Sequence, residues 1–247
     1  MKLTFIGYGK MAEAMIKGLY KTYEIEVVGR NDVKLENMQK TYNVKVALLD
    51  DFNMDNKNIV LAVKPYNLEE VSNKLKGKAN LILSVLAGCK IKNLKENLES
   101  YNFIRIMPNI ASAYSHSMTT LTGDKTYQEK AINICNSFGK SLWLESEKEL
   151  DIATAVAGSG PAYLAMVAEA LADGAVQCGL KREDAQTITA GLFDGMNPLL
   201  TNLDPAIIKN SVMSPAGTTA EGYFALEKNG VRKAFIEAVQ KAYKKTL

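Results

Sequence analysis

The sequence predicts an α/β domain built on a mostly parallel sheet, followed by an all-α domain. Three observations support this prediction. Short apolar, β-prone runs alternate with amphipathic segments through the first 145 residues, which is typical of βαβ units with right-handed connections. Beyond residue 148 the pattern is helical and contains no convincing strand. Finally, a G-x-G-x-x-A spacing follows directly on the first apolar run, at Gly7, Gly9 and Ala12.

This first motif predicts a strand over residues 3–6, a tight turn, and a helix over residues 10–19. Gly7 permits the turn, Gly9 lets the backbone approach a pyrophosphate, and small Ala12 lets helix and strand pack closely. The helix N-terminus offers free N–H groups and a partial positive charge to an anion. The same spacing also occurs at strand-to-helix turns that bind nothing, but its place after an apolar strand favours a Rossmann-type dinucleotide site. The expected phosphate-binding residues are Gly7, Tyr8, Gly9, Lys10 and Met11.

The remaining elements follow in order. Further strands are expected at 26–29, 58–63, 80–85, 103–106, 118–121 and 142–144, and helices at 32–42, 67–75, 91–98 and 127–138. Residues 145–151 carry four acidic side chains and are interpreted as a solvated linker or helix face. Helices are expected at 161–180, 182–200, 205–211, 219–228 and 231–245. The predicted domains are therefore 1–148, dinucleotide-binding, and 149–247, helical.

The expected helix over 161–180 is apolar nearly all round. Pro161 suits the first position of this helix. Glu169 and Asp173 are almost the only residues that give it a polar face. A helix of this kind must be buried against other helices or a second subunit. The sequence therefore predicts an obligate homodimer.

The end of the second strand indicates which dinucleotide is bound. NAD-type sites usually place Asp or Glu there, to accept a hydrogen bond from the ribose 2′-hydroxyl. This chain has Arg30 and Asn31 instead. A guanidinium with its forked donors suits a 2′-phosphate, which favours NADPH, with NADH as the alternative. The competing interpretation is that Arg30 is simply a solvated residue after a strand.

Two further strand ends supply candidate cofactor contacts. Ala62, Val63, Lys64 and Pro65 close one strand, and Asn109 follows another, at the edge where open α/β sheets bind ligands. They are expected beside the ribose or nicotinamide, with solvated loop positions as the alternative. His116, the only histidine, has no triad or metal-ligand spacing around it and is interpreted as a loop residue.

A second anion-friendly turn lies in the helical half, at residues 214–219. The N–H groups of Gly217, Thr218 and Thr219 could hold a small carboxylate. Equally, Thr218 could be an ordinary N-cap, with Glu221 closing a capping box three residues on. The composition alone leaves both interpretations open.

Composition limits the remaining classes. The net charge of +3, without a dense basic cluster, does not favour a nucleic-acid partner. Three scattered cysteines lack C-x-x-C spacing, so we expect no metal site and a reducing, cytoplasmic compartment. No apolar run is expected to reach membrane-spanning length.

Several segments together resemble the Δ1-pyrroline-5-carboxylate reductase family, in the family's order and over nearly the whole chain. They are residues 5–12, 62–65 (Ala-Val-Lys-Pro), 105–109 (Arg-Ile-Met-Pro-Asn), 158–163 (Gly-Ser-Gly-Pro-Ala-Tyr), 169–174 and 214–219 (Ser-Pro-Ala-Gly-Thr-Thr). The resemblance implies a Rossmann domain, a helical dimerisation domain, and larger assemblies of dimers in some members. It also implies NADPH-dependent hydride transfer to the C=N bond of 1-pyrroline-5-carboxylate, giving L-proline.

By the same resemblance, Ser214, Gly217, Thr218 and Thr219 hold the substrate carboxylate, and Thr219 is the catalytic residue beside the substrate nitrogen. The chain departs from the family pattern at Ala216, where a glycine is usual, and at residues 110–117. The alternatives are a reductase of another cyclic imine and a non-catalytic nucleotide-binding accessory protein. A β-hydroxyacid dehydrogenase is disfavoured, because no lysine lies between Lys148 and Lys181 to act as its acid–base group.

Overall fold

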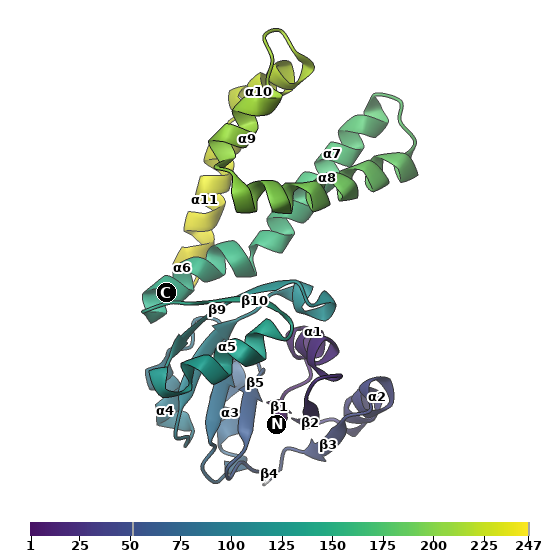
Figure 1. Ribbon diagram of the computed structural model, residues 1–247. Helices are drawn as coiled ribbons and strands as arrows, with labels where there is room; N and C mark the ends of the chain where they lie inside the picture. The colour runs from purple at the N-terminus through teal and green to yellow at the C-terminus, as the bar shows by residue number, and fades with distance from the viewer. Residues whose placement is uncertain (51, 247) are drawn as a thin grey trace. The chain divides into compact units, whose positions relative to one another are not determined.

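The first 159 residues fold around an eight-stranded sheet (Figure 1). The computed structural model describes residues 1–50 and 52–246. The strand order is β10-β9-β8-β7-β5-β1-β2-β3. The strands are β1 (Lys2–Ile6), β2 (Glu24–Gly29), β3 (Lys45–Leu48), β5 (Asn58–Leu61), β7 (Leu81–Ser84), β8 (Phe103–Met107), β9 (Ser117–Gly123) and β10 (Gly139–Trp143). Six strands run parallel, and β9 lies antiparallel to β8 with β10 parallel to β9. The predicted fold class is confirmed.

The central strands are apolar because both of their faces are covered. Leu3, Phe5, Val60 and Leu83 are completely buried, as expected for a parallel sheet with helices on both sides. Apolar side chains of α1 (Lys10–Leu19), α2 (Asp32–Tyr42) and α5 (Gln128–Asn136) pack in the core on one face. Those of α3 (Leu68–Ser72) and α4 (Ile91–Asn97) pack in the core on the other.

The sequence did not predict three short strands. These are β3 at the sheet edge and the two-residue strands β4 (Phe52–Asn53) and β6 (Leu75–Lys76), which pair in a separate small sheet. Three of the four residues of β3 (Lys-Val-Ala-Leu) are apolar, but none is fully buried, as suits a strand at the edge of the sheet. Short 3₁₀ turns at Pro65–Asn67, Ile110–Tyr114 and Lys125–Tyr127 connect other elements.

The acidic stretch after β10 is a helix, α6 (Glu147–Ala153), and it continues into a π-helical turn at Thr154–Gly158. Interpreting the stretch as solvated is wrong at Asp151, whose side chain is 1% exposed. Ser146 caps α6 by accepting a hydrogen bond from the N–H of Glu149 at 3.2 Å. The packing of α6 against β9 explains why part of this acidic segment is buried.

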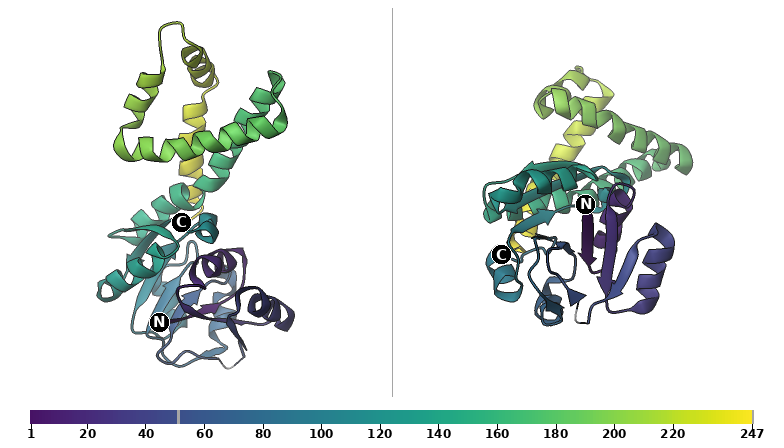
Figure 2. Two further views of the ribbon diagram at one scale, coloured as in Figure 1. Left: turned by 45° about the vertical axis from the view of Figure 1, so that its right-hand side comes forward. Right: turned by 60° about the horizontal axis from the view of Figure 1, so that its bottom comes forward.

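Residues 160–241 form a second unit, which consists of helices alone (Figure 2). Its helices are α7 (Gly160–Gln177), α8 (Arg182–Asn202), α9 (Pro205–Val212), α10 (Thr218–Lys228) and α11 (Val231–Lys244), the last of which ends in the first unit. Helix α7 packs along α8. The prediction that the second half lacks strands is confirmed for the described residues.

The continuous helical stretch Glu147–Gln177 is long and apolar enough to cross a membrane, judged by length and composition. Our expectation that no segment reaches that length is therefore wrong. Length and composition do not distinguish a membrane span from a helix covered by protein. Only 17% of its most apolar window is buried within this chain.

Candidate functional site

The glycine-rich turn leaves β1 in the conformation that the motif predicts. Gly7 has φ +110°, and a Cβ there would lie 2.6 Å from the carbonyl oxygen of Ala62. The N–H of Gly7 donates to the carbonyl of Val28 on β2 at 2.9 Å. The turn is therefore fixed between β2 and β5, and only glycine fits its first position.

Gly9 differs, because a Cβ there would meet nothing within 4 Å. Gly9 is also the N-cap of α1 and provides no side-chain cap for the first N–H groups of that helix. Open space in front of an uncapped helix N-terminus is what a pyrophosphate requires. The turn and the first residues of α1, Lys10 and Met11, therefore fit a dinucleotide.

The adenosine end of such a site would lie at the end of β2. Tyr8 packs directly on Gly29, where a Cβ would lie 1.9 Å from the ring, and the Lys34 ammonium lies 5.7 Å from the centre of that ring. Asn31 is the N-cap of α2, its side-chain oxygen accepting from the N–H of Lys34 at 3.0 Å. Arg30 forms an ion pair with Glu70 of α3.

The segment after β5 supports the same turn. Ala62 donates its N–H to the carbonyl of Ile6 at 2.9 Å, and Val63 Cγ1 would lie 3.3 Å from a Cβ on Gly7. Lys64 is exposed and precedes Pro65, which begins a 3₁₀ turn. The structure thus brings Ala62 and Val63 beside the glycine-rich turn, as the strand order requires.

Asn109 connects the end of β8 to the π-helical turn. Its amide nitrogen donates to the carbonyl of Ala157 at 2.9 Å, and its amide oxygen accepts from the N–H of Ala111 at 2.9 Å. Its own N–H donates to the Ser117 hydroxyl at 3.1 Å. Each side-chain polar atom thus makes one hydrogen bond to the protein, which fixes the orientation of the amide and holds this turn in place. π-Helical turns of this kind are frequent near functional sites.

A buried charge cluster lies beside these loops, and sequence analysis missed it. Arg105 of β8 is 0% exposed and donates to Asp151 at 2.8 Å and to Glu147 at 2.9 Å. Lys90 also pairs with Asp151, and Glu147 accepts from the N–H of Ile91 at the start of α4 at 2.9 Å. The available signal was an arginine inside an otherwise apolar strand, followed by an acidic helix.

The turn before α10 tests one of the two interpretations of residues 214–219. The N-cap of α10 is Gly217, without any side-chain cap, so the interpretation of Thr218 as N-cap with a Glu221 capping box is wrong. Ala216 takes φ +56°, the left-handed conformation that favours glycine. In the described chain no acceptor binds the N–H groups of Thr218 and Thr219. Free N–H groups at this turn fit a carboxylate.

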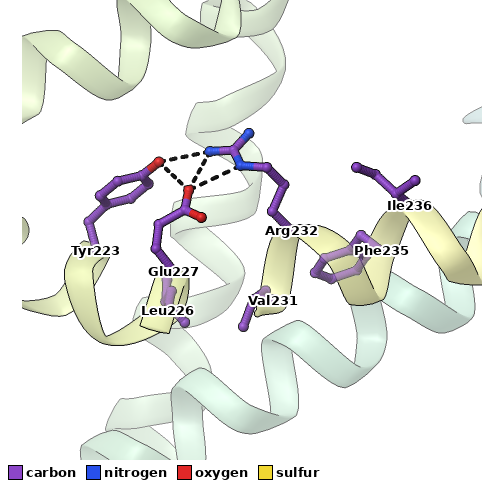
Figure 3. A pocket seen from close by; sticks show the side chains of 7 residues that line it. All are labelled: Tyr223, Leu226, Glu227, Val231, Arg232, Phe235 and Ile236. Carbon is purple, nitrogen blue, oxygen red and sulfur yellow. Dashed lines mark hydrogen bonds and ion pairs between the residues drawn. The ribbon is translucent and has the colours of Figure 1, made fainter. Parts of the chain in front are cut away.

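The helical unit also has a groove between α10 and α11 (Figure 3). It encloses about 440 Å³. Arg232 donates to the Tyr223 hydroxyl at 2.7 Å and to Glu227 at 3.1 Å. The hydrogen bond from Arg232 lowers the pKa of the Glu227 carboxyl. The rest of the lining is apolar: Leu226, Val231, Phe235 and Ile236.

The only histidine, His116, is exposed and pairs with no carboxylate in the described chain.

Two family models match the chain. Residues 147–247 match the model for pyrroline-5-carboxylate reductase dimerisation, and residues 2–88 match the model described as NADP oxidoreductase, coenzyme F420-dependent. A pyrroline-5-carboxylate reductase of Helicobacter pylori strain J99 is 35% identical over 253 residues, covering 98% of each chain. One from Synechocystis is 38% identical over 260 residues, covering 100% of this chain and 97% of the relative.

Comparison with solved structures indicates the same family as the sequence comparisons. The 1-pyrroline-5-carboxylate reductase of Streptococcus pyogenes superposes with a TM-score of 0.89 at 30% identity, covering 100% of this chain and 98% of the other. The Plasmodium falciparum pyrroline carboxylate reductase, solved with NADP bound, superposes with a TM-score of 0.85 at 27% identity and the same coverage.

Proposed function

The chain belongs to the pyrroline-5-carboxylate reductase family, and from this premise we propose how its own residues carry out the reaction. It is an NAD(P)H-dependent oxidoreductase that acts on the C=N bond of 1-pyrroline-5-carboxylate, a step of proline biosynthesis. The features that carry the proposal are two uncapped helix N-termini, one at Gly9 and one at Gly217. One suits a pyrophosphate, and the other suits a carboxylate.

The chain fits the cofactor through its glycine-rich turn. The N–H groups of Lys10 and Met11 bind the pyrophosphate, and the open space at Gly9 admits it. Arg30 binds the 2′-phosphate through its forked donors, next to Tyr8 and Lys34. When bound, NADPH supplies the hydride for the imine carbon. Lys64 and the backbone of residues 62–63 border the site.

The substrate carboxylate binds at residues 214–219. The available donors of this loop are the N–H groups of Thr218 and Thr219 and the hydroxyl of Ser214. The N–H of Gly217, which the sequence also suggested, instead donates to the carbonyl of Ser214 at 3.0 Å and closes the turn. Close, oriented approach is the main source of rate in such a reaction. Thr219 is a weak acid, so its hydroxyl orients the imine nitrogen, which arrives protonated or takes its proton from water.

The first test follows NADPH absorbance with pyrroline-5-carboxylate as substrate, with NADH alongside. We expect Thr219→Ala to lower kcat by about tenfold or more and Thr219→Ser to restore most of it. Thr41→Ala, on an exposed part of α2, is the control and leaves kcat unchanged. Unchanged turnover in Thr219→Ala would contradict the role of that hydroxyl. Cofactor binding without imine reduction would indicate a different imine or an accessory protein.

The helical unit supports a homodimer. Its buried apolar residues are only Ala172, Ala185 and Ile208, whereas large apolar side chains such as Leu171 and Phe224 are about half exposed or more. A unit with so small a core and so large an apolar surface requires a partner. A second copy that covers α7 would also account for the apolar stretch without a membrane, and the match to a dimerisation model agrees with this.

Light scattering tests the dimer directly. We expect Leu171→Lys to produce monomer or unfolded chain, while Val33→Lys, on the exposed side of α2, leaves the mass unchanged. A stable folded monomer in the unmodified protein would refute the dimer. A mass above that of a dimer would support an assembly of dimers.

The three cysteines are all free thiols, which supports a reducing compartment such as the cytoplasm.

A further inference from the structure

Arg30, the candidate partner of the 2′-phosphate, already has a partner of opposite charge. Its guanidinium donates to the carboxylate of Glu70, and the two side chains are 45% and 53% exposed. The residues lie 40 positions apart in the sequence. No motif links them, and only the fold brings them together.

The strand order explains why they meet. Strand β1 pairs with β2 on one side and with β5 on the other. Arg30 follows β2, and Glu70 lies in the first turn of α3, which follows β5. Their ion pair therefore spans the carboxyl end of β1, where the glycine-rich turn begins. A 2′-phosphate that binds Arg30 must approach next to the Glu70 carboxylate.

We propose that Glu70 is a specificity-determining residue that weakens the preference of this site for a 2′-phosphorylated cofactor. A phosphate monoester carries about −1.5 to −2 charges at neutral pH, so it competes with Glu70 for Arg30 and is repelled by the carboxylate. A cofactor with a free 2′-hydroxyl escapes this repulsion, because a carboxylate can accept its hydrogen bond, as in NAD-type sites. Glu70 thus reduces the difference between the affinities of this site for NADPH and for NADH.

This proposal rests on the proposed function, namely on the 2′-phosphate binding at Arg30. The exposure of both side chains sets the size of the effect. An exposed ion pair is weak, so Arg30 can leave Glu70 at small cost, and the effect is one of tuning rather than exclusion. Because the charges are solvated, the effect shrinks as salt is added.

The test measures binding of cofactor fragments to the whole protein by calorimetry, without turnover. The probes are 2′,5′-ADP, which carries the 2′-phosphate, and 5′-ADP, which lacks it. We expect Glu70→Gln to tighten 2′,5′-ADP binding by about three- to tenfold at low salt and to change 5′-ADP binding by less than about twofold. We expect Arg30→Gln to weaken 2′,5′-ADP binding by about tenfold and to leave 5′-ADP binding unchanged.

The matched control is Glu69→Gln. Glu69 precedes Glu70 in the same turn, is also exposed, and forms no ion pair among residues 1–50 and 52–246. The Glu69→Gln substitution therefore changes the net charge by the same amount as Glu70→Gln but leaves the ion pair of Arg30 intact. We expect it to keep the affinity for 2′,5′-ADP within about twofold of that of the unmodified protein. Weaker 2′,5′-ADP binding in Glu70→Gln, or an effect equal to that of Glu69→Gln, would overturn the proposal. If Arg30→Gln leaves 2′,5′-ADP binding unchanged, the 2′-phosphate assignment itself fails, and the proposal with it.

Discussion

Replacing Asp151 with asparagine removes one carboxylate from the buried charge cluster without changing the size of the side chain. Arg105 and Asp151 are 0% and 1% exposed, so water does not compensate for the lost charge. Breaking a buried pair typically costs about 3–5 kcal/mol. Arg105 keeps Glu147, which is 29% exposed, and asparagine retains an acceptor oxygen. We therefore expect a loss near the lower end, about 3 kcal/mol of unfolding free energy.

Urea unfolding followed by Trp143 fluorescence measures this loss. Trp143, the only tryptophan, lies on β10 in the same unit as the cluster. With a slope of about 2 kcal/mol per molar urea, the midpoint falls by about 1.5 M. The change also removes the partner of Lys90 and a contact that holds α6 on the sheet.

The control is Asp50→Asn. Asp50 pairs with Lys74 at 2.8 Å, but the two side chains are 73% and 39% exposed. The same chemical change should cost less than about 0.5 kcal/mol there. Equal losses for Asp151→Asn and Asp50→Asn would refute the argument that burial makes this cluster structurally important.

Three further predictions concern single residues. Gly9→Ala changes the unfolding free energy by less than about 1 kcal/mol, because its Cβ meets nothing, yet weakens NADPH binding by about tenfold, measured by cofactor fluorescence. Gly7→Ala instead lowers the unfolding free energy by more than about 2 kcal/mol, because its Cβ meets Ala62 at positive φ; equal behaviour of the two variants would contradict the assignment. Burial raises the pKa of the Cys135 thiol to about 12. A disulfide reagent at about pH 8 should therefore spare Cys135 in the native protein and modify it after denaturation; rapid native modification, mapped by mass spectrometry, would contradict this.

Much of the fold follows from local patterns. The alternation of apolar runs and amphipathic segments predicts the parallel sheet, and the absence of such runs after residue 148 predicts the helices. The glycine-rich turn is equally local, because Gly7 and Gly9 follow one strand and begin one helix. The short strand β3 (Lys-Val-Ala-Leu) escaped prediction because so short an apolar run does not distinguish a strand from a turn of helix.

Part of the candidate site could not be predicted, because it depends on contacts between distant segments. Composition left the turn at residues 214–219 open, and only the backbone conformation, with Gly217 as N-cap, leaves the N–H groups of Thr218 and Thr219 free. Likewise, Asn109 has its amide committed to Ala157 and Ala111, which its place after a strand does not reveal.

The charged pairs show the same limit most clearly. Arg105 meets Asp151 across 46 positions, and Arg30 meets Glu70 across 40. Hydrophobic periodicity specifies which face of an element is buried, but a charged side chain leaves no such periodic signal. Its partner is set by which strands become neighbours and how far a helix extends over them. Local sequence thus determines the elements and the glycine-rich turn. Tertiary packing decides which charges are buried and which groups of the protein remain free to bind a ligand.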